Sequence, residues 1–287
     1  MNRTDTKAEL NDSFGGAWLV REHVYDPAGD YLGEVRQRRQ LRREQDGRIA
    51  VIQDCEPGPG LRNHPMSRFE GHWEFLLSKS GPRREYQGPD VVGTGFMWQE
   101  GMMRGTGFWP RFGKNFSSYA FMSHAERQCT GGTFSHSAHP VACITGIAAP
   151  ESAGEWPSLS LDTHPADIGR EWAGTSRAYS PSGDLMAEEE VLRSYASSDS
   201  YSEETGSAHS LVGTCPSGRV QGLLAGVPLR GLLKRYGNRW EFDAVARDRV
   251  TWSELLDPQT ATLFIFRESY QNQQLQQVDI ARLEATA

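Results

Sequence analysis

The sequence of 287 residues has no hydrophobic run that approaches the roughly 18–20 residues of a membrane-spanning helix. Its opening, MNRTDTKAELND, is polar and lacks the apolar stretch of a secretory signal. We therefore expect a disordered tail over residues 1–12, a cytoplasmic protein and no membrane partner. The cysteines form no CxxC pair, which favours free thiols; they are Cys55, Cys129, Cys143 and Cys215.

Familiar catalytic motifs are absent as well. The sequence contains no GxSxG, no Walker loop, no HExxH and no glycine pattern of a dinucleotide-binding fold. Nucleotide-dependent chemistry is therefore disfavoured, and we expect no cofactor. His136 and His139 are three residues apart, which places them on opposite faces of a strand, so no metal site is expected there.

Positive charge is in deficit, with 30 basic against 37 acidic residues and a formal net charge of −7. This balance disfavours nucleic acid as a main partner. The basic run RQRRQLRR at 36–43 is the local exception. We interpret it as the solvated face of a strand, with a phosphate-binding patch as the alternative.

Helical periodicity is scarce, and the short stretch SELLDP at 253–258 is one of the few helix candidates. The 30 glycines argue against long helices, because each costs roughly 1 kcal/mol in a helix interior. In contrast, RFEGHWEFLL at 68–77 alternates strictly and TATLFIFRESY at 260–270 is rich in strand-forming residues. Strand signals of this kind indicate an all-β protein built of antiparallel barrels.

A pattern near the N-terminus recurs in the second half of the chain. Residues 18–39 match residues 172–193 at seven identical positions, where ordinary residue frequencies give about one or two. The pairs are Trp18/Trp172, Tyr25/Tyr179, Pro27/Pro181, Gly29/Gly183, Asp30/Asp184, Glu34/Glu188 and Arg39/Arg193. The Tyr-x-Pro-x-Gly-Asp portion predicts a tight turn, because proline presets φ and glycine accepts a positive φ.

Two weaker echoes follow downstream. VVGTG at 91–95 resembles LVGTC at 211–215, and PRFGKNF at 110–116 resembles KRYGNRW at 234–240. We infer an internal duplication. The expected organisation is a first barrel over 13–150, a linker over 151–168 and a second barrel over 169–287.

The two openings resemble those of lipocalin-like (calycin) barrels, which often read G-x-W-x-G and then Y-x-P-x-G. The matching residues are Gly16, Trp18, Tyr25, Pro27 and Gly29 in the first copy, and Trp172, Gly174, Tyr179, Pro181 and Gly183 in the second. Val20 departs from the pattern, since it stands where the second glycine is expected. The resemblance implies two lipocalin-like barrels, and an eight-stranded barrel holds one small ligand. It implies no single activity, because such barrels include carriers, haem binders, bilin lyases and cofactor-free cyclases or hydratases.

The segment TGFMWQEGMMRGTGFWPRFG at 94–113 is rich in side chains suited to a pocket. Alternate residues of a strand face opposite sides, and one set combines aromatic, thioether and charged groups. Either this set faces the barrel interior, or it faces outward beside a glycine-rich core face. The expected ligand-binding residues are Trp98, Met102, Phe108, Trp109, Arg68, His64 and Tyr119.

Acid–base groups are expected from the same segment and from the strand at 68–77. If the charged face of that strand points inward, a carboxylate beside a histidine can move a proton; if it points outward, it is solvated surface. The expected catalytic residues are Glu100 or Glu70 as base, His72 as acid–base partner and Arg104 as stabiliser of an oxyanion.

The second copy reads as plainly aliphatic over PSGRVQGLLAGVPLRGLL at 216–233, so chemistry is expected in the first barrel. The predicted function is binding of a bulky hydrophobic or aromatic small molecule, with cofactor-independent cyclisation, isomerisation, hydration or elimination. The alternative is a non-catalytic carrier or sensor of a hydrophobic ligand or tetrapyrrole. A homodimer through the second barrel is a further expectation.

Overall fold

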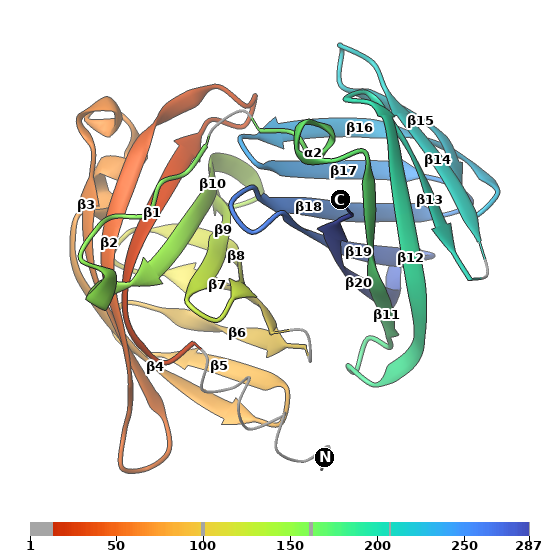
Figure 1. Ribbon diagram of the computed structural model, residues 1–287. Coiled ribbons are helices and arrows are strands. Elements are labelled where there is room, and N and C mark those ends of the chain that lie inside the picture. The colour runs from red at the N-terminus through yellow and green to blue at the C-terminus, as the bar shows by residue number, and fades with distance from the viewer. Residues whose placement is uncertain (1–13, 99–100, 161–162, 207, 287) are drawn as a thin grey trace. The chain divides into compact units, whose positions relative to one another are not determined.

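The computed structural model describes residues 14–98, 101–160, 163–206 and 208–286. The expected tail over residues 1–12 lies outside them. The chain divides into two compact units, Met1–Leu159 and Ser160–Ala287. Each unit contains one closed antiparallel β-barrel (Figure 1).

The first barrel has ten strands in a closed ring, in which each strand pairs with its sequence neighbours and β1 closes onto β10. The strands are β1 (Gly16–Tyr25), β2 (Tyr31–Arg43), β3 (Ile49–Pro57), β4 (Gly71–Ser80), β5 (Arg83–Gln87), β6 (Val92–Met97), β7 (Met102–Trp109), β8 (Lys114–His124), β9 (Arg127–His136) and β10 (His139–Pro150).

The second barrel repeats this topology with ten further strands, and β11 closes onto β20. The strands are β11 (Glu171–Tyr179), β12 (Leu185–Ser197), β13 (Ser200–Thr205), β14 (His209–Thr214), β15 (Arg219–Leu224), β16 (Val227–Tyr236), β17 (Arg239–Val245), β18 (Arg249–Asp257), β19 (Thr262–Gln271) and β20 (Gln274–Ala285).

Helix is limited, among the described residues, to short turns. They are the 3-10 turns η1 (Pro59–Leu61), η2 (Pro65–Phe69) and η3 (Glu151–Ala153), and the helix α2 (Pro165–Ile168). In the described parts of the chain, no helix has the length and apolar character needed to cross a membrane.

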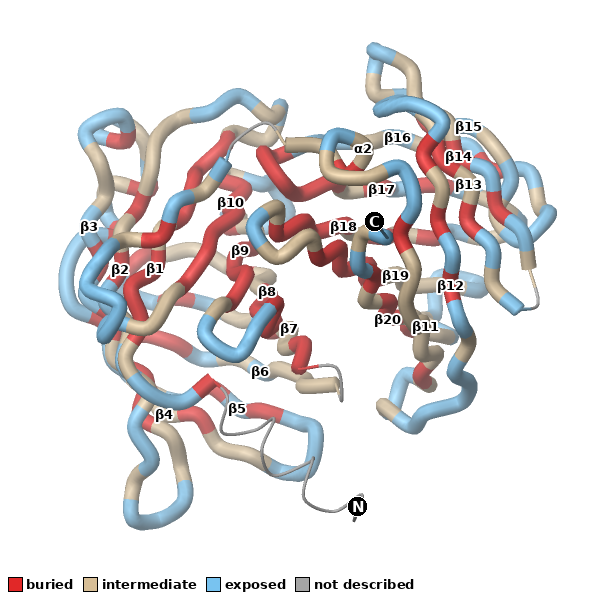
Figure 2. The backbone as a smooth tube through the Cα atoms, viewed as in Figure 1, coloured by how far each residue is buried: buried red, intermediate tan, exposed pale blue. Residues whose placement is uncertain are grey.

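Burial alternates along many strands, as two-faced strands of a barrel require (Figure 2). On β4, Trp73, Phe75 and Leu77 are buried while Glu74 is exposed. The buried side chains form a separate apolar core inside each barrel. Sheet closure leaves no free strand edge in either ring, which removes the usual site of edge-to-edge aggregation.

The repeated turn motif joins the first two strands of each barrel. In the first copy the Asp26 carboxylate accepts hydrogen bonds from the backbone N–H groups of Ala28, Gly29 and Asp30, at 2.8, 2.9 and 2.9 Å. Gly29 has φ of 103° and Gly183, its counterpart in the second copy, has φ of 90°. Both conformations favour glycine, which explains why the repeat retains it.

The all-β prediction and the tandem arrangement of two antiparallel barrels are confirmed. Three details differ. Each barrel has ten strands rather than eight, and SELLDP at 253–258 lies mainly in strand β18 rather than in a helix. The downstream echoes pair strands that do not correspond: 91–95 lies at β6 and 211–215 at β14, whose counterpart in the first barrel is β4.

Candidate functional site

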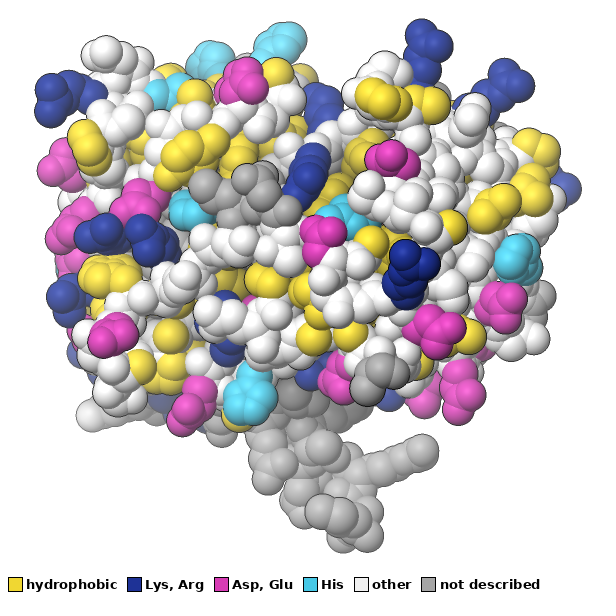
Figure 3. Space-filling view, turned by 45° about the horizontal axis from the view of Figure 1, so that its top comes forward, with side chains coloured by type: hydrophobic (Ala, Val, Ile, Leu, Met, Phe, Trp, Pro, Cys, Tyr) yellow, Lys and Arg dark blue, Asp and Glu magenta, His cyan; other side chains and the backbone are white. Residues whose placement is uncertain are grey.

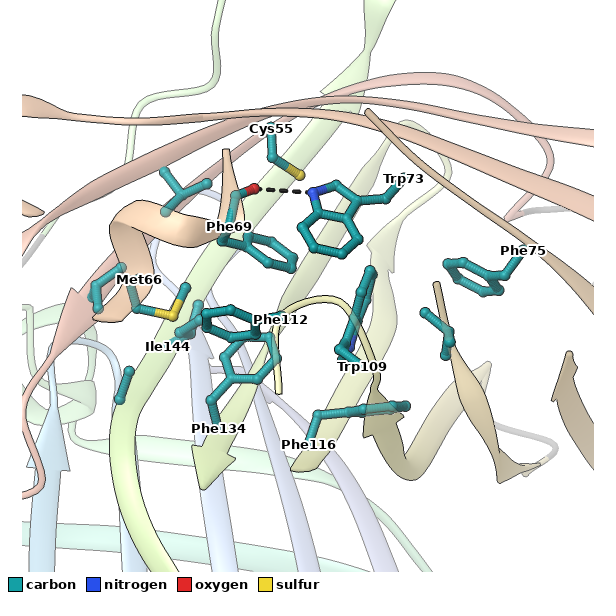
Figure 4. Packing of buried hydrophobic residues seen from close by; sticks show 14 of the residues in the cluster. Cys55, Met66, Phe69, Trp73, Phe75, Trp109, Phe112, Phe116, Phe134 and Ile144 are labelled. Carbon is teal, nitrogen blue, oxygen red and sulfur yellow. Dashed lines mark hydrogen bonds between the residues drawn. The ribbon is translucent and has the colours of Figure 1, made fainter. Parts of the chain in front are cut away.

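The first barrel encloses a cavity of about 200 Å³. One part of its wall is aromatic, because inward positions on η2, β4, β5, β7, β8 and β9 carry rings. Phe69 lies at the centre of this part, with its ring centroid 5.1 Å from that of Trp109 and 5.4 Å from that of Phe134 (Figure 4). The other rings that line the cavity belong to Phe75, Tyr86 and Phe116, together with Phe14 from the segment before β1.

One end of the cavity is closed by the two 3-10 turns between β3 and β4. They insert Leu61, Met66 and Phe69 into the barrel core, where all three are buried. The Trp73 indole Nε1 donates a hydrogen bond to the Phe69 carbonyl oxygen at 3.0 Å, which fixes the turn to β4. At the opposite end the exposed residues Gly15 and Arg43 line the cavity, so it opens to the surface there.

A polar part of the wall is formed by β1, β2 and β9 around Glu22. Gln37 Nε2 donates to Glu22 Oε2 at 2.5 Å, and Thr130 Oγ1 donates to Glu22 Oε1 at 3.0 Å. Thr130 and Glu22 belong to strands separated by β10, where Gly146 pairs with both. A Cβ on Gly146 would lie 2.5 Å from Glu22 Cγ, so the missing side chain lets the two residues meet.

Glu22 is buried, with 6% of its surface exposed. Burial raises the pKa of the Glu22 carboxyl above its usual range, against the lowering effects of the Arg39 charge and of the hydrogen bonds from Thr130 and Gln37. A carboxyl group in this setting can hold a proton at a pH where an exposed glutamate is ionised.

Two nitrogens of this polar wall lack hydrogen-bond partners among the described residues. They are Arg39 Nε and Gln128 Nε2, and both are buried. Arg39 Nη2 donates to Gln37 Oε1 at 3.1 Å, so Gln37 stands between the guanidinium and Glu22. Buried donors are usually satisfied in folded proteins, and Arg39 and Gln128, which carry these two, both line the cavity.

A comparison with the second barrel shows which residues leave a cavity in the first. The strand registers place Gly105, Ser118 and Gly132 in one inward-facing row of the first barrel. The corresponding row of the second barrel holds larger side chains, Phe242, Trp252 and Arg267. The next row toward the open end repeats the contrast, with Met103, Ala120 and Thr130 against Trp240, Glu254 and Ile265.

The interior of the second barrel is not the plainly aliphatic one expected from residues 216–233. Arg193, fully buried, lies 2.6 Å from Glu203 Oε2 and 2.8 Å from Glu254 Oε1. The Tyr201 hydroxyl and the Trp252 indole both donate to Glu254 at 3.1 Å. The sequence-based interpretation considered only 216–233, whereas these residues come from β12, β13 and β18.

Two of the predicted ligand-binding residues line the cavity, Trp109 and Tyr119. Trp109 belongs to the aromatic wall described above. Tyr119 has the strand parity opposite to that of Phe116 and Ala120, and its hydroxyl lies 3.5 Å from Thr145 Oγ1. Its phenol group is therefore engaged with the neighbouring strands.

The remaining predicted residues of 94–113 that the structure describes lie outside the cavity lining. Met102 is buried with 1% exposure beside Phe121, its pairing partner on β8, and Phe108 is 38% exposed. Arg104 is half-buried on the same face of β7, and Trp98 follows β6 with its ring centroid 4.7 Å from that of Phe96. Glu100 lies outside the described residues.

These residues lie outside the cavity because the other set of alternate residues on β7, which is rich in glycine, faces inward. This orientation is the second of the two alternatives considered for the segment 94–113. A Cβ on Gly105 would lie 2.5 Å from the Tyr86 hydroxyl, and a Cβ on Gly107 would lie 2.8 Å from Phe116 Cε1. Rings from the neighbouring strands cover this face of β7. The cavity therefore receives Met97, Met103 and Trp109 rather than the set that carries Arg104.

The predicted residues near β4 also lie away from the cavity. Arg68, Glu70 and His72 are exposed, and His72 Nδ1 lies 2.8 Å from Asp54 Oδ1 on the outer surface. His64 accepts a hydrogen bond from the Met66 backbone N–H at 3.3 Å and so caps η2. The charged face of this strand therefore points outward and is solvated surface, which is the second of the two alternatives considered for residues 68–77.

The basic run at 36–43 was interpreted as a solvated face, and this interpretation is wrong for Gln37, Arg39 and Leu41, whereas Arg43 is exposed at the open end. Gln37, Arg39, Leu41 and Arg43 line the cavity, because they share the inward parity of β2. The repeat contained a signal for this, since Arg39 and Arg193 are an identical pair with inward side chains. Nothing in a charged run distinguishes its two faces without knowledge of the partner strands.

No group of three or more His, Cys, Asp or Glu side chains suited to a metal ion occurs among the described residues.

No protein-family model matches the sequence, and no curated protein matches it. Among solved structures, the chain is similar to a protein of unknown function from the DUF3598 family of Nostoc punctiforme PCC 73102. That likeness has a TM-score of 0.63 and 13% sequence identity over 97% of this chain and 98% of the other. Another similar structure is the S-type phycobiliprotein lyase CPES of Guillardia theta, with a TM-score of 0.36 and 9% identity over 50% of this chain and 89% of the other. At such low identity the first likeness shows a shared fold of two barrels, and neither indicates an activity.

Proposed function

We propose that the first barrel binds one small, largely aromatic molecule in its cavity, within a lipocalin-like fold. The observation that carries this proposal is the contrast between the barrels. Matching inward rows hold Gly105, Ser118 and Gly132 in one barrel and large side chains in the other. The cavity also combines an aromatic wall with a few convergent polar groups, which is the usual composition of a ligand site.

Cavity size narrows the ligand class. An engineered apolar cavity of about 150 Å³ holds benzene, so about 200 Å³ suits a body of one or two rings. The four rings of a tetrapyrrole exceed this enclosed volume. A tail that leaves through the open end beside Gly15 and Arg43 is compatible with the site.

The test is calorimetric titration of the full chain with 2-naphthamide, an uncharged two-ring probe. We expect one site per chain in the wild type. Ser118→Trp introduces the residue that the second barrel carries at the corresponding position, Trp252, and is expected to remove binding by filling the cavity. Ala120→Leu is a smaller filling change that should weaken binding at least several-fold.

A matched control places the same bulk outside the barrel. Thr106 is exposed on β7 beside the Gly105 position, and Thr106→Trp should bind the probe as the wild type does. Far-ultraviolet circular dichroism checks that each variant folds. Unchanged binding by folded Ser118→Trp and Ala120→Leu would mean that the cavity is not the site.

A second function, acid–base catalysis in the same cavity, is favoured by Glu22. Its buried carboxyl lines the cavity and burial raises its pKa, which suits a group that gives and takes a proton. Glu22 takes the part for which Glu100 and Glu70 were expected. We infer cofactor-independent proton transfer on a bound aromatic carbonyl compound.

Hydrogen exchange tests this second function without knowledge of the substrate. The methyl protons α to the carbonyl of 2-acetonaphthone exchange slowly with D2O, and proton NMR follows their loss. We expect the wild type to accelerate the exchange and Glu22→Gln to abolish the acceleration while still binding 2-naphthamide. Equal exchange rates with both proteins would leave binding as the only function.

A further inference from the structure

We propose that the cavity of the first barrel selects ligands with an anionic head group, a carboxylate or sulfonate, that binds Arg39. This proposal rests on the proposed binding function and adds the chemical class of the ligand. In it, the apolar body of the ligand packs against Trp109 and Phe116 while the head group meets the polar wall.

The charge of the cavity differs in sign from that of the whole chain. Among the described residues that line it, Glu22 is the one acidic residue and four are basic, namely Arg39, Arg43, Lys79 and Arg84. The chain as a whole has a net charge of −7. On the face seen in Figure 3, acidic and basic side chains are interspersed rather than separated by sign. The concentration of cations is therefore a property of the cavity, and it favours an anion there.

The second barrel shows which partners a buried arginine has at the position equivalent to Arg39. Arg193 corresponds to Arg39, and each pairs across the sheet with the repeated tryptophan of the preceding strand. Two carboxylates neutralise Arg193, from Glu203 on β13 and Glu254 on β18. The register makes Glu203 the cross-strand partner of Arg193.

The first barrel lacks both carboxylates at the corresponding positions. Gln53 is the cross-strand partner of Arg39 on β3, where the second barrel has Glu203. Ala120 stands where the second barrel has Glu254. The space and the charge that the Glu254 side chain supplies in one barrel are thus left to a ligand in the other.

Hydrogen-bond donors are available for such a head group. Arg39 Nε and Gln128 Nε2 are buried and have no partner among the described residues. Gln128 is 2% exposed and lies one inward step from Thr130, on the side of the open end. Arg39 lies one such step from Gln37. A guanidinium binds carboxylates through paired N–H donors, and an amide N–H adds a neutral donor.

The test compares two probes of nearly equal shape, 2-naphthoate and 2-naphthamide, by calorimetric titration of the full chain. We expect the wild type to bind the anion about tenfold more tightly than the amide. Arg39→Gln should remove this preference and leave the affinity for 2-naphthamide within about twofold. Its control is Arg42→Gln, on the exposed face of the same strand, which should keep the preference.

A second variant tests the comparison between barrels directly. Gln53→Glu places a carboxylate where the second barrel has Glu203, so it should satisfy Arg39 from within and remove the preference for the anion. Gln40→Glu, exposed on β2, is its control. This variant also keeps the proposal falsifiable if Arg39→Gln does not fold.

The outcomes separate the two proposals. Equal affinity of the wild type for both probes, or a preference that persists in Gln53→Glu and Arg39→Gln, overturns anion selection while the binding function stands. Failure of both probes to bind the wild type overturns the binding function and the anion selection together.

Discussion

The buried ion pair of Arg193 and Glu203 makes the stability of the second barrel depend on pH. Burial alone would raise the pKa of Glu203, but the charges of Arg193 and Arg267 outweigh it and lower that pKa to about 2. A lowered pKa in the folded state stabilises the protein above the unfolded pKa, and this stabilisation is lost as the pH falls from about 4.5 to about 2. Removing one member of a buried ion pair leaves the other charge without compensation.

We therefore expect Glu203→Gln to lower the free energy of unfolding by about 3 kcal/mol at pH 7. The difference from the wild type should shrink as the pH falls from 4.5 toward 2, where Glu203 itself becomes protonated. Urea denaturation at several pH values measures this. Glu204→Gln is the control, since Glu204 is exposed on the adjacent position of β13. A cost that does not vary with pH would assign the effect to packing rather than to charge.

At the scale of elements, the turns η1 and η2 act as a plug that closes the first barrel. Phe69 is the plug residue that borders the cavity, and its ring also contacts Trp73 and Phe112 at centroid distances of 5.3 and 5.5 Å. Truncation of a buried phenylalanine removes these contacts and leaves a void.

Phe69→Ala is expected to cost about 3–5 kcal/mol of unfolding free energy. The same change should deepen the cavity, so that 2-anthramide, with three rings, gains affinity relative to 2-naphthamide. Arg68→Ala, exposed on the same turn, should leave both quantities within experimental error of the wild type. Thermal denaturation and calorimetric titration measure them. A destabilised variant with an unchanged probe preference would place the cavity floor elsewhere.

The strands could be predicted from the sequence, whereas the faces of several strands could not. Alternation on β4 was readable because the buried Trp73 and Phe75 alternate with the polar residues His72 and Glu74. On β7 the inward face carries Gly105 and Gly107, whose role is visible only when Tyr86 and Phe116 are placed over them. An inward glycine looks like an empty position in the sequence, so the cavity was assigned to the opposite set of residues.

The basic run at residues 36–43 was also assigned to the wrong face of its strand in part. Burial of arginine is unusual, so a run of basic residues reads as surface. In β2 the inward half of that run contacts groups from distant strands, such as Glu22 through Gln37, and no local pattern reports them. The duplication could have helped, because Arg39 is an identity between the copies that the turn motif does not explain.

At the scale of the whole molecule, the two copies retain one fold and differ in what fills it. The repeated tryptophans keep the same role, since the Trp18 and Trp172 indoles each donate to a backbone carbonyl three residues earlier, at 3.1 and 3.0 Å. Shared contacts of this kind preserve the barrel. Divergence is concentrated in inward rows, where small residues give a cavity and large ones give a packed interior.

Closure of each ring predicts that the barrels fold independently. Every strand of the first barrel finds its neighbours within residues 16–150, and every strand of the second within residues 171–285. Each unit also has its own apolar core, so neither needs the other to complete a sheet or to bury its interior side chains.

We expect the fragments 1–159 and 160–287 to show dispersed amide spectra by NMR and cooperative thermal unfolding. Fragment 1–159 should bind 2-naphthamide with the affinity of the full chain, while fragment 160–287 should not bind it, because Trp252, Phe242 and Arg267 occupy the corresponding space. Binding by the second fragment, or a first fragment that folds but has lost its affinity, would show that the site is not contained in the first barrel.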